Sequence, residues 1–267
     1  MGIFDGILLC TDLDGTFLHE ARASEENCRA IKYFQDNGGY FTVATGRSPV
    51  FVREFENYSP NAPLIVSNGT QICDHISGNT LRYFDMPEYT SEVLDELAAL
   101  GMLKDVFLYD LHDGGTQMPL SDHRHWNVKM DTSPGEWFSH VPRPWVKMLL
   151  QQGTQEENAA LKEYIDTRCP GMFETDRSYS IGLELHAPGS GKGPCVDILR
   201  RMLPDIRLVV GAGDYENDIS LLEHADIGYA VDNALDCVKA AADRVTVPCT
   251  EHAIARIIAD IKKEYGR

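Results

Sequence analysis

The chain has 267 residues, of which 43% are hydrophobic and 24% are charged, and its formal net charge is −17. This length and composition are sufficient for one large globular domain or two smaller ones with a substantial hydrophobic core. The negative charge argues against binding to nucleic acids or anionic membranes, which requires clustered Lys and Arg, although a metal ion and a few cations can still create a local site for a phosphorylated metabolite.

The first predicted element ends in a pair of acids. Residues 7–10 form an apolar run that predicts a strand buried on both faces, and the sequence DLDGT follows at residues 12–16. Carboxylates at positions i and i+2 of an extended segment point to the same side, so we expect Asp12 and Asp14 together at the carboxyl end of the strand, where open α/β sheets bind ligands. A divalent cation with oxygen ligands, Mg²⁺ before Ca²⁺, would offset their repulsion. The alternative is an Asp-Gly turn that closes a hairpin.

Helices and strands then alternate, as capping residues and apolar spacing indicate. The predicted elements are a helix over 24–37, a strand over 40–44, a helix over 48–58 and a strand over 64–67. Short connections between such elements are typical of a doubly wound α/β core.

The pattern changes near residue 83. From there to residue 184 the helices are more polar and the strand candidates alternate, and all three Trp of the chain lie in this stretch, where we expect them in a core. We predict an inserted α+β module with an antiparallel sheet. Its strand candidates and Trp residues are 106–109, 146–150, 179–183, Trp126, Trp137 and Trp145.

The first pattern returns at about residue 185. The predicted elements are a helix over 194–203, a strand over 206–210, a helix from 217, a strand over 227–231, a helix over 234–242, a strand over 244–247 and an amphipathic helix over 251–265. The core domain is therefore expected to comprise residues 1–82 and 185–267, with residues 83–184 inserted between its halves.

Polar residues also follow the second predicted strand. Thr45 and Gly46 offer a hydroxyl and backbone N–H groups at the start of a helix, an arrangement suited to an anion, although a simple Gly turn would use the same residues. Arg47 either faces this anion or forms a surface ion pair. Both alternatives remain open from the sequence.

A late strand is followed by more acid. Asp214, Asn217 and Asp218 come directly after it, and a helix cap would need only one of them. Because the carboxyl ends of parallel strands lie on one edge of a sheet, we expect these side chains beside Asp12.

The Gly-rich segment at residues 189–193 fails the nucleotide-loop pattern, because Gly193 stands where Ser or Thr is required. Its Lys192 is either solvated or, opposite a carboxylate cluster, balances charge and holds a phosphate.

The cysteine pattern bears on location. Seven Cys are scattered without C-x-x-C spacing, which is typical of reduced thiols in a cytoplasmic protein. We expect no signal peptide and no membrane span, since no apolar run has the required length.

Four motifs now carry a resemblance to a known family. They are DxDGT at 12–16, TGR at 45–47, Lys192 and GDxxND at 213–218. Their order and spacing resemble those of the haloacid dehalogenase (HAD) superfamily, in particular its Cof-type phosphatases of subfamily IIB. The resemblance covers essentially the whole chain, and the segments 67–69 and 231–234 also look like that subfamily.

The resemblance implies a Rossmann-like three-layer core with a parallel sheet and an inserted α+β cap of the C2 type that sets specificity. Asp12 would be the nucleophile that forms an aspartyl-phosphate, and Asp14 would be the general acid and then the base. Thr45, Gly46, Lys192 and Asn217 would hold the phosphoryl oxygens. The Mg²⁺ ligands would be the Asp12 carboxylate, the Asp14 backbone carbonyl, Asp214 and, through water, Asp218.

The function that this resemblance implies is a Mg²⁺-dependent phosphatase acting on small phosphorylated metabolites such as sugar phosphates. The alternative is a phosphotransferase or phosphomutase on the same scaffold. A non-catalytic phosphometabolite-binding protein is less favoured, because both acids are present. The segment HRHW at 123–126 either contacts the leaving group or is a solvated loop, and the oligomeric state, monomer or weak dimer, stays open.

Overall fold

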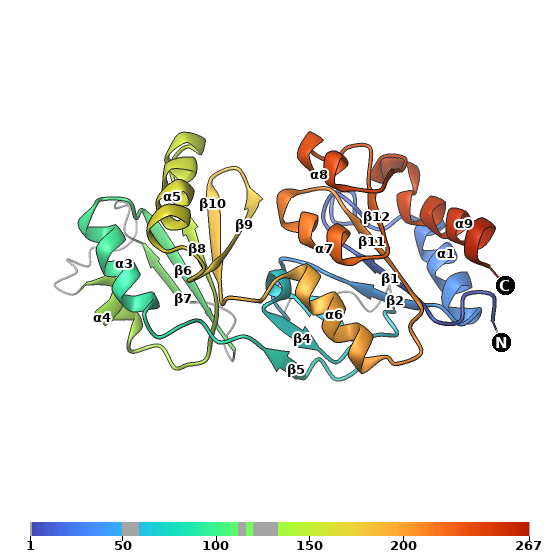
Figure 1. The fold of residues 1–267 in the computed structure, drawn as a ribbon, viewed down its shortest axis with the longest axis horizontal. Helices are drawn as coiled ribbons and strands as arrows, with labels where there is room; N and C mark the ends of the chain where they lie inside the picture. The colour runs from blue at the N-terminus through green and yellow to red at the C-terminus, as the bar shows by residue number, and fades with distance from the viewer. Residues whose placement is uncertain (1, 50–58, 112–115, 120–132, 267) are drawn as a thin grey trace. The chain divides into compact units, whose positions relative to one another are not determined.

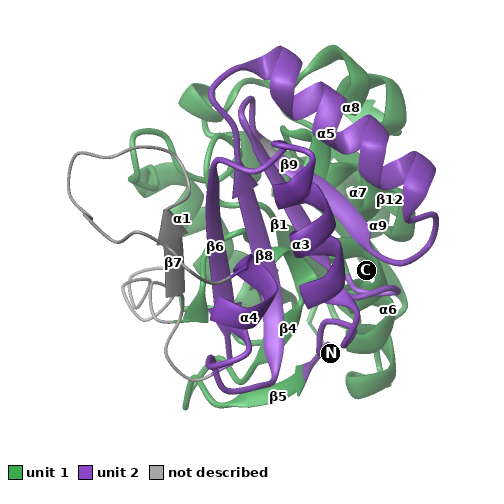
Figure 2. Cartoon of the chain, turned by 90° about the vertical axis from the view of Figure 1, so that its left-hand side faces the viewer, with its two compact units in different colours: residues 1–82, 191–267 green, residues 83–190 purple. Residues whose placement is uncertain are grey.

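The computed structural model describes residues 2–49, 59–111, 116–119 and 133–266. The chain divides into two compact units, one formed by residues 1–82 and 191–267 and the other by residues 83–190 (Figure 2). The second unit thus begins at the residue where the sequence pattern changes. It extends six residues beyond residue 184.

The first unit contains a five-stranded parallel sheet in the order β13-β12-β11-β1-β2 (Figure 1). β1 lies inside it, between β11 and β2, and all five of its residues are buried, as its continuous apolar run predicts. The strands are β1 (Ile7–Thr11), β2 (Tyr40–Val43), β11 (Leu208–Gly213), β12 (Ile227–Ala230) and β13 (Arg244–Val245).

Helices cover this sheet and complete its core. Ile31 and Phe34 of α1 (Glu25–Asp36) and the Ile residues of α9 (Ala253–Tyr265) share one cluster with Ile7 and Leu9 of β1. α7 packs on β11 and β12 and against α6 (Figure 1). Among its described residues, this unit also contains the helices α6 (Lys192–Met202), α7 (Ile219–His224) and α8 (Asp236–Ala241). The predicted α/β core with a parallel sheet is confirmed.

A small antiparallel sheet follows the second strand of the core. It is formed by β3 (Leu64–Val66), β4 (Gln71–Cys73) and β5 (Thr80–Tyr83), in that order. β3 also meets the end of β2, because Ala44 forms a parallel bridge with Ile65. The 3₁₀ turn η2 (Ser67–Gly69) therefore begins close to the carboxyl end of β2.

The second unit is an α+β module with a five-stranded antiparallel sheet, as predicted. Apolar residues of α3 and α5 share a core with Val106 and Leu108 of β6, which explains the period of two in that strand, whereas β8 is buried on both faces. The elements are α3 (Thr90–Ala99), β6 (Asp105–Asp110), β7 (Thr116–Pro119), α4 (Pro134–Phe138), β8 (Trp145–Gln151), α5 (Gln155–Arg168), β9 (Glu174–Tyr179) and β10 (Gly182–His186).

The strand predicted over 179–183 is wrong. β9 ends at Tyr179 and β10 begins at Gly182, so the predicted strand spans a hairpin turn. A Cβ atom on Gly182 would lie 2.5 Å from the Tyr179 ring, so any larger residue there would displace that ring. The turn was missed in the sequence because apolar residues continue on both sides of it, as they would in one uninterrupted strand.

Other predictions fall partly or wholly outside the described residues. These are the helix over 48–58, of which only residues up to Pro49 are described, the segment at 123–126 and Trp126. Trp145 is buried in the core of the second unit, and Trp137 packs against that core.

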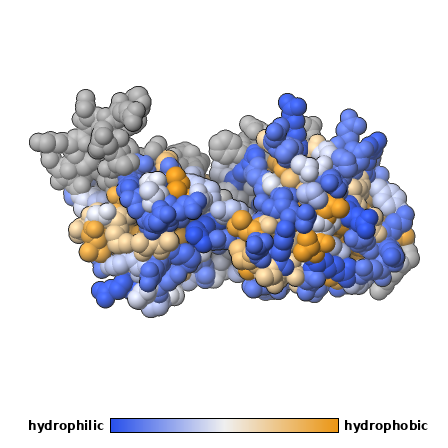
Figure 3. Space-filling model, turned by 90° about the horizontal axis from the view of Figure 1, so that it is seen from above, coloured by the Kyte–Doolittle hydropathy of each residue, from blue (hydrophilic) through white to orange (hydrophobic). Residues whose placement is uncertain are grey.

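The surface is mostly hydrophilic in the face that Figure 3 shows, with apolar residues scattered over it. None of the helices in the described part of the chain has the length and hydrophobicity that a membrane span requires.

Candidate active site

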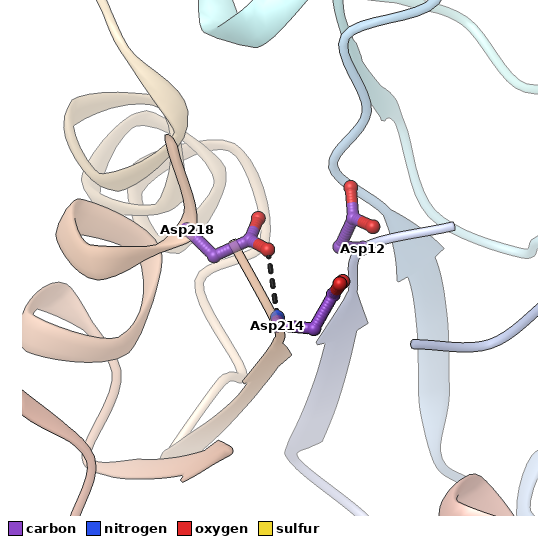
Figure 4. Close-up of side chains that lie close together, drawn as sticks. All are labelled: Asp12, Asp214 and Asp218. Atoms are coloured by element: carbon purple, nitrogen blue, oxygen red, sulfur yellow. Dashed lines mark hydrogen bonds between the residues drawn. The ribbon is translucent and has the colours of Figure 1, made fainter. Parts of the chain in front are cut away.

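Three carboxylates converge at the carboxyl ends of β1 and β11. Asp12 follows β1, and Asp214 and Asp218 follow β11. The two strands are parallel neighbours, and the pairing of Thr11 with Ala212 brings their ends together. One oxygen of each carboxylate lies within 4.8 Å of the others (Figure 4).

Asp218 is held in place by the backbone of the turn after β11. Its Oδ2 accepts a hydrogen bond from the backbone N–H of Asp214 at 2.9 Å (Figure 4) and a second one from the backbone N–H of Tyr215 at 3.1 Å. A Cβ atom on Gly213 would lie 2.3 Å from the Cβ of Asp218, so a glycine is needed there. The turn therefore directs this carboxylate toward the other two.

Lys192 is the first residue of α6 and is completely buried. Its Nζ lies 2.7 Å from Asp12 Oδ1 and 2.5 Å from Asp218 Oδ1. Burial alone would lower the pKa of Lys192, but the carboxylates of Asp12 and Asp218 raise it above its ordinary value. Lys192 is therefore not solvated: its ammonium group balances the charge of two carboxylates.

Asp12 and Asp214 remain costly to ionise despite this lysine. Burial, with the charge of Asp218, raises the pKa of Asp12 well above its ordinary value, and Lys192 opposes this shift. Burial also raises the pKa of Asp214 to about 6, although a hydrogen bond of 2.7 Å from Thr16 acts to lower this pKa. Two buried carboxylates and the partly buried carboxylate of Asp214 face one ammonium group, and such an all-oxygen donor set with excess negative charge fits a hard divalent cation such as Mg²⁺.

Asp14 takes a different position from the one expected. Its carboxylate is not part of the group of three, because β1 ends at Thr11 and the chain leaves the extended conformation before Asp14. Its side chain is 55% exposed and forms a bidentate pair with Arg47, with Nε 2.8 Å from Oδ2 and Nη2 2.5 Å from Oδ1. Arg47 therefore forms an ion pair, and its partner is the other acid of the DxD motif.

The loop after Asp14 supports Asp214. Gly15 has a φ of +88°, and a Cβ atom there would lie 2.5 Å from Asp214 Oδ2. Thr16 Oγ1 donates to Asp214 Oδ1, and Asn233 Nδ2 donates to the Gly15 carbonyl at 2.8 Å. The sequence reasoning assigned no role to Thr16 or Asn233, although both lie in segments that resemble the family pattern.

The residues expected to bind phosphoryl oxygens come from two further segments. Thr45 is buried at the end of β2, and its Oγ1 accepts a hydrogen bond from the Arg47 N–H at 3.1 Å. Asn217 lies beside Asp218, and its Nδ2 donates to Asn68 Oδ1 at 3.0 Å. A Cβ atom on Gly46 would lie 3.0 Å from that same oxygen. Asn68, which the sequence reasoning left without a role, therefore connects the two segments.

Comparison with known proteins identifies relatives along the whole chain. A family model described as haloacid dehalogenase-like hydrolase matches residues 9–258. The chain is 25% identical over 268 residues to a 5-amino-6-(5-phospho-D-ribitylamino)uracil phosphatase of Bacillus subtilis, with 94% of each chain covered. It is 26% identical over 273 residues to a pyridoxal phosphate phosphatase of Escherichia coli, with 94% and 97% covered. Its fold is similar to that of a HAD phosphatase from Bacteroides thetaiotaomicron, with a TM-score of 0.79, 21% identity and 96% and 95% of the two chains covered.

Proposed function

Since the chain belongs to the haloacid dehalogenase-like hydrolases, we propose that it is a Mg²⁺-dependent phosphatase that hydrolyses small phosphorylated metabolites through an aspartyl-phosphate on Asp12. The observation that carries the proposal is the convergence of Asp12, Asp214 and Asp218 around Lys192. Buried acids with raised pKa values beside a paired cation are typical of catalytic sites.

Asp12 is the proposed nucleophile. A carboxylate oxygen attacks phosphorus, a new P–O bond forms, and the bond between phosphorus and the leaving oxygen breaks. Lys192 opposes the rise in the pKa of Asp12 and orients its carboxylate through the bond to Oδ1. Water then attacks phosphorus in the aspartyl-phosphate, which releases inorganic phosphate and restores Asp12.

Asp14 is the proposed general acid and base. It donates a proton to the leaving oxygen in the first step and accepts one from the attacking water in the second. Its exposed side chain can exchange protons with solvent, and the paired Arg47 fixes its direction. The presence of this acid favours hydrolysis over transfer to a second substrate. Product analysis separates the two, because a mutase retains phosphate on the substrate.

The other residues of the site would hold the phosphoryl oxygens and the metal. Thr45 Oγ1, the Gly46 N–H, Lys192 and Asn217 are the proposed phosphate ligands. Asp12, Asp214 and the Asp14 carbonyl would hold Mg²⁺, with Asp218 supporting through water. When bound, the ion would supply positive charge that reduces the repulsion between the Asp12 carboxylate and the phosphate.

The proposed substrates are small phosphomonoesters such as sugar phosphates. The relatives named above support this class, since one acts on a phosphorylated ribityl compound and the other on pyridoxal phosphate. A hydrolysis screen over a panel of phosphorylated metabolites would narrow the class.

Metal removal is expected to abolish turnover and lower stability. The protein should release phosphate from p-nitrophenyl phosphate with Mg²⁺ and not with EDTA, and Mg²⁺ at about 100 times its Kd should raise the free energy of unfolding by about 2.7 kcal/mol. Thermal unfolding with and without Mg²⁺ measures the second effect. Asp214→Asn is the matched variant, which should lose most of that stabilisation. Undiminished turnover in EDTA would contradict the metal assignment.

Gly15→Ala is expected to lower kcat/KM by about 10²-fold, because the added methyl group displaces Asp214. It should also cost about 1–2 kcal/mol of stability, since φ is +88°. Gly101→Ala is the control, because Gly101 has a φ of +67° with no atom within 4 Å of the added Cβ. That control should lose stability and keep activity. Equal activity in both variants would show that Asp214 does not depend on the Gly15 loop.

A further inference from the structure

The η2 turn at Ser67–Gly69 is bonded to the segment that follows β2. The Ser67 N–H donates to the Arg47 carbonyl at 2.8 Å, and the Asn68 N–H donates to the Thr45 carbonyl at 2.9 Å. Both bonds are between backbone groups, so they hold the two segments in one register. The phosphate-binding segment at residues 45–47 is therefore supported by this turn.

The same turn is bonded to the start of α6. The Gly69 carbonyl accepts hydrogen bonds from the Gly191 N–H at 3.3 Å and from Cys195 Sγ at 3.1 Å. A Cβ atom on Gly69 would lie 2.1 Å from the Gly191 carbonyl carbon, so the two backbones are in close contact. Gly191 directly precedes Lys192, and the turn thus also supports the buried lysine.

The backbone of this turn is strained. Ser67 and Asn68 both have left-handed conformations, with φ values of +51° and +56°. Two consecutive residues other than glycine in this region cost free energy, and such strain persists only where the surroundings require it. The result of this conformation is that the Asn68 side chain is completely buried and lies against Asn217.

The bond between the two asparagines determines the orientation of the Asn217 amide. Asn68 Oδ1 is an acceptor, so the Asn217 atom that faces it is the Nδ2 donor. An Nδ2 group carries two hydrogens, and fixing one of them fixes the direction of the other. In turns an Asn side chain usually forms a hydrogen bond with a backbone group a few residues away in the sequence, whereas this bond joins residues 149 positions apart.

We propose that Asn68 is a positioning residue for phosphoryl transfer, because its side chain holds the Asn217 amide as a donor toward the phosphoryl group and its backbone ties that amide to Thr45. This inference rests on the proposed function of the site. Asn68 acts through Asn217 and does not itself contact the substrate.

Two substitutions separate the side chain of Asn68 from its backbone. Asn68→Gly removes Oδ1 and still adopts the left-handed conformation without strain, whereas Asn68→Ala removes Oδ1 and keeps the strain. Both variants should lose tenfold to a hundredfold in kcat/KM for p-nitrophenyl phosphate with Mg²⁺. Asn68→Ala should have the lower unfolding temperature of the two, because both variants lose the buried hydrogen bond and only Asn68→Ala keeps the strain. A folded Asn68→Gly variant with wild-type kcat/KM would overturn the inference.

A double-mutant cycle with Asn217→Ala tests whether Asn68 acts through the amide. Asn68→Gly should change kcat/KM less than twofold in the Asn217→Ala background, and the two single variants should show the same division between kcat and KM. If the two losses multiply instead, Asn68 does not position Asn217 and the inference fails, while the proposed function stands. A wild-type protein that releases no phosphate would overturn the proposed function and this inference with it.

Discussion

Asp12→Asn is expected to lower kcat for phosphate release by at least about 10⁴-fold. An amide has almost the shape of a carboxylate but cannot attack phosphorus or form an acyl phosphate. The same substitution should not lower the unfolding temperature, because burial and the charge of Asp218 raise the pKa of Asp12 and make its ionised form unfavourable in the folded protein. Steady-state assays and thermal unfolding measure the two effects.

The control for Asp12→Asn is the same change at an exposed acid of the same unit. Asp36 lies near the end of α1 and pairs with Lys32 on the surface, so Asp36→Asn should keep wild-type turnover. Undiminished turnover by Asp12→Asn would reject Asp12 as the nucleophile. A large loss of stability in that variant would instead indicate that Asp12 has mainly a structural role.

Lys192→Met is expected to destabilise the protein by about 3–5 kcal/mol, because it leaves Asp12 and Asp218 buried without the ammonium group that pairs with both. Turnover should also fall sharply, since the proposed phosphate ligand is lost. Denaturant unfolding without divalent metal measures the stability term. Added Mg²⁺ should recover part of it, because the ion would offset the same carboxylates.

The control for Lys192→Met is Lys32→Met on α1. Lys32 also pairs with an aspartate, but its side chain is largely exposed, and such a pair contributes less than about 1 kcal/mol. The difference between the two variants therefore isolates burial of the pair. If both variants lost the same small amount, the Lys192 pairs would contribute no more than surface ion pairs do.

Much of the core could be predicted because its signals are local. Ser24 caps the N-terminus of α1, as expected for a serine that directly precedes a segment with apolar residues at helical spacing. The continuous apolar run of β1 likewise predicts a strand that is buried on both faces. Parallel topology then places the residues that follow β1 and β11 at one edge of the sheet. The proximity of Asp12, Asp214 and Asp218 was predicted by this reasoning, whereas their roles stay predictions.

Other features could not be predicted because they depend on backbone turns. The direction of the Asp14 side chain changes once the strand ends at Thr11, so the rule for extended segments no longer applies to it. The hairpin between β9 and β10 was missed because apolar residues continue across its turn. In both places a few φ and ψ values decide the geometry, and many sequences allow either outcome.

The sequence by itself determined the fold class, the family and the set of polar residues at the strand ends, because periodicity, capping and motif order are properties of neighbouring residues. Only the tertiary structure decided which distant side chains meet: Arg47 with Asp14, Lys192 with two of the acids, and Asn68 with Asn217. Such contacts form because packed strands and strained turns bring separate segments within hydrogen-bond distance. The sequence of either segment alone therefore does not predict which distant residue it will contact.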